Sequence, residues 1–300
     1  MIVAHATDLA PMRAPRALMG LSPPRVTYLK SPSTDLALMT PVAVHFLAQQ
    51  RIVRSRPLKA ILMLTLVILF AETALAIGSR AGALAAVAGA LSLALFRCRP
   101  RAVLIALLSV VCTVLLSATI VVGHTLRDGF IAKAIAHLGP SAEHRRIVWV
   151  FSSELAARRP LLGHGLGTSR SIPDGQRFIL LDPTQVRMGD YDGYPIQLIP
   201  LHPHNLSIEV ALELGVVGLV PVATVYALVL AGIGGSRGLS ARWSASVGVL
   251  TSAFVVQHVS FSAWNPALLS MTMATAALAW VAAQTLASDV AGANARAQPR

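Results

Sequence analysis

Charged residues are scarce in this chain. Asp, Glu, Lys and Arg make up 13% of its 300 residues, hydrophobic residues make up 55%, and the mean hydropathy is +0.65. Soluble globular domains carry about 25% charged residues, so the composition excludes that class. The sequence predicts an all-α, polytopic integral membrane protein.

Cysteine is nearly absent. Cys98 and Cys112 fall in a predicted turn and inside a predicted span, so we expect no disulfide framework and no cysteine-based metal site. Asp182, Asp190 and Asp192 do not have the arrangement of a metal site either. We therefore expect no essential metal and no cofactor.

Acidic residues are also few, 13 against 25 Lys and Arg, which gives a net charge of +12. Such a charge can indicate nucleic-acid binding, but no RNA- or DNA-binding motif is present. Nearly half of the basic residues lie in clusters beside the predicted spans. We expect membrane lipids as partners, and no nucleic acid.

Long apolar runs predict six membrane-spanning helices, since about 20 apolar residues cross the hydrocarbon core. The six runs are Ala60 to Gly78, Ala81 to Phe96, Ala102 to Gly123, Leu206 to Ile233, Ser244 to Ser262 and Ala267 to Ala287. A seventh segment, Asp35 to Ala48, is short and carries Asp35 and His45. It is a further span, an interfacial segment or the remnant of a helix.

The basic clusters predict the orientation, because short cytoplasmic loops carry the excess of Lys and Arg. The clusters are Arg51, Arg54, Arg56 and Lys59; Arg97, Arg99 and Arg101; Arg237 and Arg242; and Arg296 and Arg300. All fall on one side of six spans. We predict an irregular region 1–50, three spans in 51–123, a large outer loop over 124–205, three spans in 206–287 and a cytoplasmic tail 288–300.

The first 33 residues contain five prolines and scattered arginines, without the pattern of a cleavable signal peptide. If Asp35 to Ala48 crosses the membrane, these arginines violate the charge rule. That conflict favours a truncated start.

The outer loop contains one predicted helix, from about Ala142 to Arg158, with an apolar stripe of Ile147, Val150, Phe151 and Leu155. Pro160 is expected to end it, and a glycine-rich turn follows at 163–167 without the Lys-Ser/Thr of a P-loop. The segment from Thr168 to Pro200 has no clear periodicity. His202-Pro203-His204-Asn205 then stands directly before the Leu206 span, which indicates chemistry at the bilayer surface.

Arg80 lies at the predicted outer end of a span, where the charge rule does not place arginine. A guanidinium binds phosphate oxygens bidentately, so Arg80 is a candidate site residue. The alternative is a snorkelling arginine that marks the end of the helix.

Three separated elements resemble the superfamily of O-antigen ligases and O-antigen polymerases. They are Arg80-Ala81-Gly82-Ala83-Leu84, similar to the ligases' R-x3-L element; Arg145-Arg146-Ile147-Val148-Trp149 followed by Pro160 to Gly167; and His204-Asn205, nine residues, then Gly215-Val216-Val217-Gly218. Family members carry further spans before this region, whereas little precedes Arg51 here.

The resemblance implies a GT-C-like glycosyltransferase of the bacterial inner membrane with its large loop in the periplasm. It implies transfer of a glycan from undecaprenyl diphosphate to a hydroxyl of the lipid A core, as a ligase, or of a growing polysaccharide, as a polymerase; the ligase is favoured. His204 is implied to be the catalytic base, and Arg80 and Arg145 are suited to bind the leaving diphosphate.

Three loop residues keep a structural alternative. Arg146 either shares the phosphate role or is an exposed loop arginine. His164 either reaches the substrate or is a solvated turn histidine, and Trp149 is expected to be a packing anchor rather than a sugar platform.

Four residues of the third element are expected to support the site. Asn205 is predicted to cap the span. Glu213 is expected to pair with an arginine of the site, to orient His204 or to form a structural ion pair. Gly215 and Gly218 are expected to permit close helix packing.

A transporter or a non-catalytic envelope protein is the alternative from another class. Transporters place polar residues at mid-bilayer depth and show internal repeats. Here Glu72, Gln257 and His258 are the few polar groups within spans, and no repeat is visible. The sequence therefore favours an enzyme.

Overall fold

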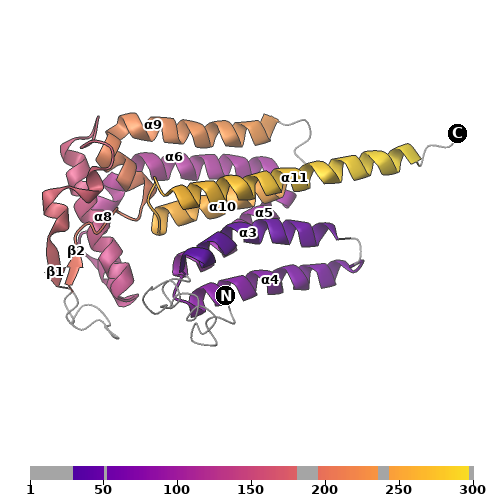
Figure 1. The fold of residues 1–300 in the computed structure, drawn as a ribbon, viewed down its shortest axis with the longest axis horizontal. Helices are drawn as coiled ribbons and strands as arrows, with labels where there is room; N and C mark the ends of the chain where they lie inside the picture. Colours follow the sequence, from indigo (N-terminus) through magenta and orange to yellow (C-terminus); the bar gives the residue numbers. More distant parts are fainter. Residues whose placement is uncertain (1–29, 51–52, 181–194, 236–242, 297–300) are drawn as a thin grey trace, which may run out of the picture. The chain divides into compact units, whose positions relative to one another are not determined.

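The chain folds into two compact units in the computed structural model, which describes residues 30–50, 53–180, 195–235 and 243–296 (Figure 1). One unit comprises the chain up to Leu104, Ile233–Val256 and the chain from Pro266; the other comprises Ile105–Gly232 and Gln257–Asn265. The proline-rich start, Arg51, Arg237, Arg242, Arg300 and the three aspartates 182, 190 and 192 lie outside the described residues.

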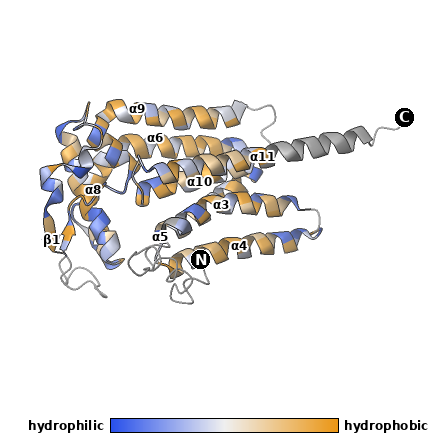
Figure 2. Cartoon of the chain, in the orientation of Figure 1, coloured by the Kyte–Doolittle hydropathy of each residue, from blue (hydrophilic) through white to orange (hydrophobic). Residues whose placement is uncertain are grey.

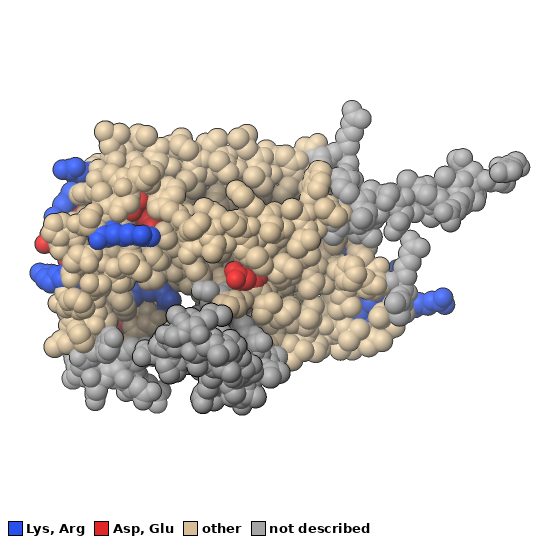
Figure 3. All heavy atoms as spheres, in the orientation of Figure 1, with Lys and Arg blue, Asp and Glu red and all other residues tan. Residues whose placement is uncertain are grey.

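Among the described residues, four helices are long and apolar enough to cross a membrane: α4 (Arg56–Ala76), α5 (Arg80–Cys98), α6 (Pro100–Thr125) and α9 (Leu206–Gly235). Figure 2 shows α4, α6 and α9 hydrophobic along most of their length, and few charged side chains cover the long helices on the face drawn in Figure 3. Two shorter apolar helices follow, in α10 (Ser244–Val259) and in the Pro266–Val281 part of α11 (Pro266–Arg296). The prediction of a helical, polytopic membrane protein is confirmed.

The doubtful segment Asp35 to Ala48 is part of a 20-residue helix, α3 (Lys30–Gln49). This helix contacts α4, α5 and α11, and its Leu38 and His45 are fully buried. A Cβ on Gly89 of α5 would stand 2.8 Å from both the Gly248 carbonyl oxygen and the ring of Pro41. Glycine therefore lets α3, α5 and α10 approach closely.

The connection from α4 to α5 is a sharp turn at Gly78-Ser79-Arg80. Gly78 has φ +74°, in the left-handed region that favours glycine. The Ser79 hydroxyl accepts a hydrogen bond from the Gly82 N–H at 3.3 Å and caps α5, whose first residue is Arg80.

The predicted outer loop is a folded part of the second unit. It contains α7 (Phe130–His137), α8 (Pro140–Arg158), the 3-10 helices η2 (Thr168–Arg170) and η3 (Pro173–Gln176), and an antiparallel pair of strands, β1 (Phe178–Leu180) and β2 (Pro195–Gln197). The helix expected over Ala142 to Arg158 is confirmed. Neither α7 nor the two short strands were expected, and the fold is all-α as predicted.

The buried face of α8 differs from the predicted stripe. Only Leu155 of the four predicted residues is fully buried, whereas Val148, Ser152, Ser153 and Ala156 are buried as well. A Cβ on Gly123 of α6 would lie 3.6 Å from the Ser153 Cβ. Small residues thus form the contact with α6, and Ile147 turns instead toward Ile196 of β2.

Candidate functional site

The turn before α9 holds a histidine in an unusual backbone conformation. His204 has φ +57°, and among the described residues it is the only non-glycine in the left-handed region. The next residue, Asn205, accepts a hydrogen bond from the Ile208 N–H on its Oδ1 at 3.2 Å. The prediction that Asn205 caps this helix is confirmed.

Two histidines in this turn have opposite tautomers. The Nδ1 of His204 lies 2.6 Å from the Ser260 carbonyl oxygen. A carbonyl only accepts, so Nδ1 carries the proton and the neutral ring keeps a lone pair on Nε2. The Nδ1 of His202 accepts the His204 backbone N–H at 3.1 Å, which leaves the His202 proton on Nε2. Of the two rings, His204 therefore offers its Nε2 as a base.

Helix α8 supports the turn from the side. The indole Nε1 of Trp149 donates to the Pro203 carbonyl oxygen at 2.8 Å. The rings of His202 and His204 are in edge contact, with centroids 4.1 Å apart. Trp149 thus anchors the turn through a hydrogen bond.

The environment keeps both rings neutral. Burial lowers the pKa of His204 to about 4; the hydrogen bond to Ser260 raises it and the positive charge of Arg145 lowers it. Burial lowers the pKa of His202 to about 3, with the charges of His204 and Arg170 acting in the same direction. At neutral pH both histidines are uncharged.

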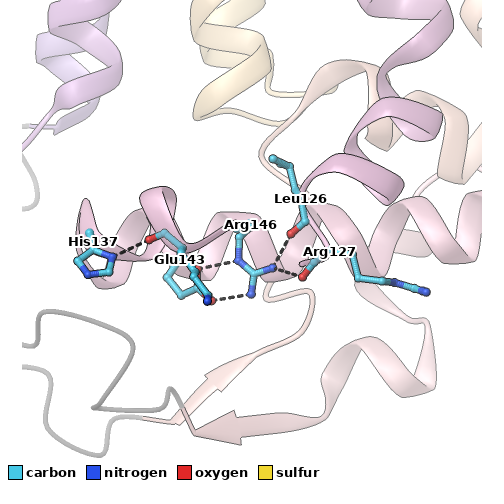
Figure 4. A network of polar contacts seen from close by, with 6 residues as sticks. Leu126, Arg127, His137, Glu143 and Arg146 are labelled. Atoms are coloured by element: carbon cyan, nitrogen blue, oxygen red, sulfur yellow. Dashed lines mark hydrogen bonds and ion pairs between the residues drawn. The ribbon is translucent and has the colours of Figure 1, made fainter. Parts of the chain in front are cut away.

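The neighbouring arginines 145 and 146 point to different partners. Arg145 donates to the Ser141 hydroxyl at 3.0 Å, and its charge acts on both His204 and His144. Arg146 forms a bidentate ion pair with Glu143, with both nitrogen–oxygen distances 2.7 Å. It also donates to the carbonyl oxygens of Leu126 and Arg127 (Figure 4).

These contacts assign different environments to the two arginines. The Arg146 side chain is 15% exposed and joins α8 to the end of α6. Arg145 is the member of the pair that the structure brings near His204. The expectation of an exposed Arg146 is not met, because its guanidinium is occupied by Glu143 and two backbone carbonyls.

The glycine-rich turn after α8 crosses α9 at a break in that helix. Gly215 has φ +63° and ψ −157°, so the helical hydrogen bonds are interrupted there. The N–H groups of Val216 and Val217 donate to Pro160 and Leu161, while the carbonyls of Leu212 and Glu213 accept from His164 and Gly165. Two donors and two acceptors of the helix backbone at the break thus bond to the turn instead.

Two glycines make this crossing possible. A Cβ on Gly215 would lie 2.3 Å from the Leu161 carbonyl oxygen, and one on Gly163 would lie 2.4 Å from the Glu213 carbonyl carbon. Gly215 therefore permits close approach of a loop backbone rather than of another helix. Gly218, by contrast, would meet Leu214 of its own helix, with a Cβ–Cβ distance of 2.3 Å.

Glu213 stabilises the crossing through hydrogen bonds to its carboxylate. Its buried carboxylate accepts from the Gly167 N–H at 2.8 Å, the Ser169 N–H at 3.3 Å and the Trp264 Nε1 at 2.8 Å. These contacts make Glu213 a connector of three segments, and the expected arginine pair is not among its hydrogen bonds in the described part of the chain. Glu209, one turn earlier, accepts from the Ser262 hydroxyl and the Ala263 N–H.

His164 also has a structural contact. Its Nε2 donates to the Leu155 carbonyl oxygen at 2.9 Å, and its backbone N–H donates to Leu212. The ring therefore fastens the turn to the last part of α8. It is not the solvated turn histidine expected from the sequence.

A cleft of about 580 Å³ lies between the crossing and the α10–α11 connection. Its lining includes Arg170, Leu201, Glu209, Glu213 and Trp264. Sequence reasoning missed Ser260, Arg170 and Trp264, because their relation to the motifs arises only from folding. Arg80 belongs to the other unit, at the start of α5.

The described residues contain no group of three or more His, Cys, Asp or Glu side chains that could hold a metal ion. The polar atoms around His204 are imidazole, guanidinium and carbonyl groups. They are suited to proton transfer and to anion binding.

Apolar helices long enough to cross a bilayer, joined to a folded loop that carries a histidine turn, define a polytopic membrane protein. A sequence model described as O-antigen ligase matches residues 60–223, more than half of the chain. The chain belongs to the O-antigen ligase family and is a bacterial membrane protein.

Curated relatives share parts of this region. The chain is 38% identical over 81 residues to a Rickettsia conorii protein, covering 27% of this chain and 18% of the relative. It is 29% identical over 126 residues to a Rickettsia prowazekii protein, covering 42% of this chain and 29% of the relative. It is 28% identical over 142 residues to a Rickettsia typhi protein, covering 47% of this chain and 31% of the relative. All three are named "Putative polysaccharide ligase".

The chain thus matches less than a third of the length of each of these relatives. No solved structure matches the chain at comparable significance.

Proposed function

We propose that the chain carries the catalytic loop of a GT-C-like membrane glycosyltransferase, most closely an O-antigen ligase. In this proposal a glycan moves from undecaprenyl diphosphate to a hydroxyl of the lipid A core; a growing polysaccharide is the acceptor if the enzyme is a polymerase. Family membership supports the reaction class. The observation that carries the mechanism is the fixed, neutral His204 with its proton on Nδ1.

His204 acts as the general base. As the acceptor hydroxyl attacks the anomeric carbon, its proton passes to the His204 Nε2, and the bond from that carbon to the diphosphate oxygen breaks. The ring then becomes an imidazolium whose Nδ1–H still donates to Ser260. The carbonyl thus holds the ring in one orientation before and after proton transfer.

Arg145 supports the same step electrostatically. A guanidinium beside the leaving diphosphate stabilises the negative charge that develops on it. The bound diphosphate would also offset the positive charge that lowers the pKa of His204. Donor binding is therefore expected to raise that pKa toward the range where the ring accepts a proton.

Arg80 and Arg146 have different roles in this proposal. Arg80 is proposed as a second diphosphate ligand because it matches the R-x3-L element. We assign Arg146 to holding α8 against the end of α6, because Glu143 and two carbonyls occupy its donors.

The break in α9 suggests where the bilayer begins. Leu206–Leu214 carries Glu209 and Glu213, whereas the 20 residues from Val216 to Gly235 contain no charged side chain. About 20 residues suffice to cross the hydrocarbon core. We place Val216–Gly235 in the membrane and Leu206–Leu214 with the 124–205 loop on the periplasmic side, within the predicted arrangement of three spans, loop and three spans.

The test compares His204→Asn with the wild-type chain in vesicles loaded with lipid-linked glycan. Asparagine tolerates a left-handed backbone, and its side-chain amide can donate to Ser260, but it has no basic lone pair. We expect glycan transfer to fall by roughly 100- to 10,000-fold while membrane insertion is unchanged. Full transfer by this variant would remove His204 from the mechanism.

Arginine variants provide a matched pair. Arg145→Met is expected to lose transfer and keep the folded state, whereas Arg146→Met is expected to lose stability first, because Glu143 is left buried without its partner. If both variants yielded the same amount of folded protein and lost transfer equally, the separate roles assigned to Arg145 and Arg146 would be contradicted.

Ligase and polymerase are distinguished in a deletion strain. Absence of polymer on the lipid A core indicates a ligase. Single repeat units in place of long chains indicate a polymerase.

A further inference from the structure

Helix α7 turns three large apolar side chains outward. Phe130 is 86% exposed, Leu138 at its C-terminal end is 60% exposed and Ile131 is 45% exposed, while Ala132 and Ala136 are buried. At about 100° per residue the three large side chains fall within an arc of about 100°. Ala132 and Ala136 face the protein, and Ile135 is half-buried.

This arrangement is the reverse of a water-facing helix, which buries its large apolar residues. The adjacent candidate span α6 shows the same inversion, with Ile105 67% and Ile120 65% exposed. Helix α6 ends at Thr125 and α7 begins at Phe130. Such a short connection, about 17 Å at full extension, keeps α7 close to the end of the span.

A polar edge borders the apolar arc. Lys133 and His137 are exposed, and the His137 Nδ1 donates to the Lys133 carbonyl at 2.7 Å. Lysine beside an apolar face is typical of helices that lie in the plane of a membrane surface, with the ammonium among the lipid phosphates.

We propose that α7 is an interfacial helix that lies on the bilayer, with Phe130, Ile131 and Leu138 among the lipid acyl chains. The occupant of its apolar face is the lipid of the leaflet in which α6 ends. This proposal requires only that α6 spans the membrane, and it stands whichever reaction the chain supports.

The docking of α7 has a consequence for α8. The two helices are in contact, and Ala132 and Ala136 of α7 line a pocket of about 410 Å³ together with Glu143 and Arg146 of α8. If α7 is held in the membrane interface, its contacts with α8 fix the depth of α8 relative to the bilayer. Helix α8 carries Arg145. That arginine would then stand at the level of a lipid-linked diphosphate.

The test places single cysteines in a Cys98→Ser, Cys112→Ser background of the full chain. Phe130→Cys and the matched control Lys133→Cys are labelled with bimane and reconstituted in phosphatidylethanolamine–phosphatidylglycerol nanodiscs. We expect a nitroxide on the lipid acyl chain to quench position 130 more than position 133, and aqueous iodide to show the opposite order.

Two results would overturn the proposal. Equal iodide quenching at both positions would place the apolar face in water. Protection of position 130 from both quenchers would mean that protein covers the face. Leu138→Cys repeats the measurement on the same arc if Phe130→Cys does not fold.

Discussion

Two neighbouring regions fix the first part of α9 by different means. The crossing of the Pro160–Gly165 turn over the Gly215 break is made of backbone hydrogen bonds and depends on glycines. The His202–Asn205 turn is made of side-chain contacts from Trp149, His202 and Asn205. The first region positions the chain, and the second positions one imidazole nitrogen.

The difference predicts how each region responds to change. A backbone crossing tolerates changes of neighbouring side chains but not an added Cβ at the point of contact. A turn made of side-chain contacts keeps its fold through many substitutions, yet small changes alter the protonation or position of its ring. The glycine that holds the backbone crossing and the histidine that serves as a base can therefore be altered separately, although they lie only about ten residues apart in sequence.

The largest effect is expected for Gly215→Ala. The new Cβ would lie 2.3 Å from the Leu161 carbonyl oxygen, and φ +63° with ψ −157° is a conformation that only glycine adopts readily. We expect destabilisation of more than about 4 kcal/mol, measured as loss of folded protein in detergent.

Gly232→Ala is the control. Gly232 lies in the same helix as Gly215, and a Cβ added there would meet nothing within 4 Å. Equal stability of the two variants would show that the crossing does not depend on Gly215.

Acidification is expected to weaken the histidine turn. In the unfolded chain His204 takes up a proton as the pH falls through about 6.5, whereas the folded pKa is about 4. The contribution of His204 to the free energy of unfolding should therefore be fully present above pH 6.5. It should be lost progressively as the pH falls from 6.5 to 4. This one group accounts for about 3 kcal/mol.

Thermal unfolding at a series of pH values measures this dependence, and His204→Asn should reduce it. An unchanged pH dependence in that variant would show that His204 is not buried in its neutral form.

A smaller effect is expected for Trp149→Phe, which keeps an aromatic ring and removes the donor to Pro203. We expect about 1 kcal/mol of lost stability and a lower kcat with little change in KM for the lipid-linked donor. A change confined to KM would mean that Trp149 contacts the substrate rather than the turn.

The sequence predicts the apolar helices well because their signal is local. Each of the six apolar runs forms a helix, Asn205 caps α9 as its residue type suggests, and α8 ends at Arg158, two residues before Pro160. The histidine motif is likewise visible in the sequence, because His202-Pro203-His204-Asn205 stands directly before an apolar run.

Long-range partners could not be predicted in the same way. The glycine at 215 shows that space or a special conformation is needed, but nothing local identifies Leu161 as the contact. Arg145 and Arg146 are alike in sequence, and only the position of Glu143 one turn earlier separates their roles. Helix α7 was missed because its eight residues are fewer than the window over which helical periodicity is recognised.

The central claim is that the His204 Nε2 is an unprotonated base on a fixed ring. It is tested most directly by nitrogen-15 NMR of histidine-labelled protein in nanodiscs, with the His204→Asn spectrum subtracted to identify one ring among nine histidines. At pH 7 the account predicts a protonated Nδ1 and an unprotonated Nε2 for this ring. An imidazolium, or a proton on Nε2 instead, would contradict it.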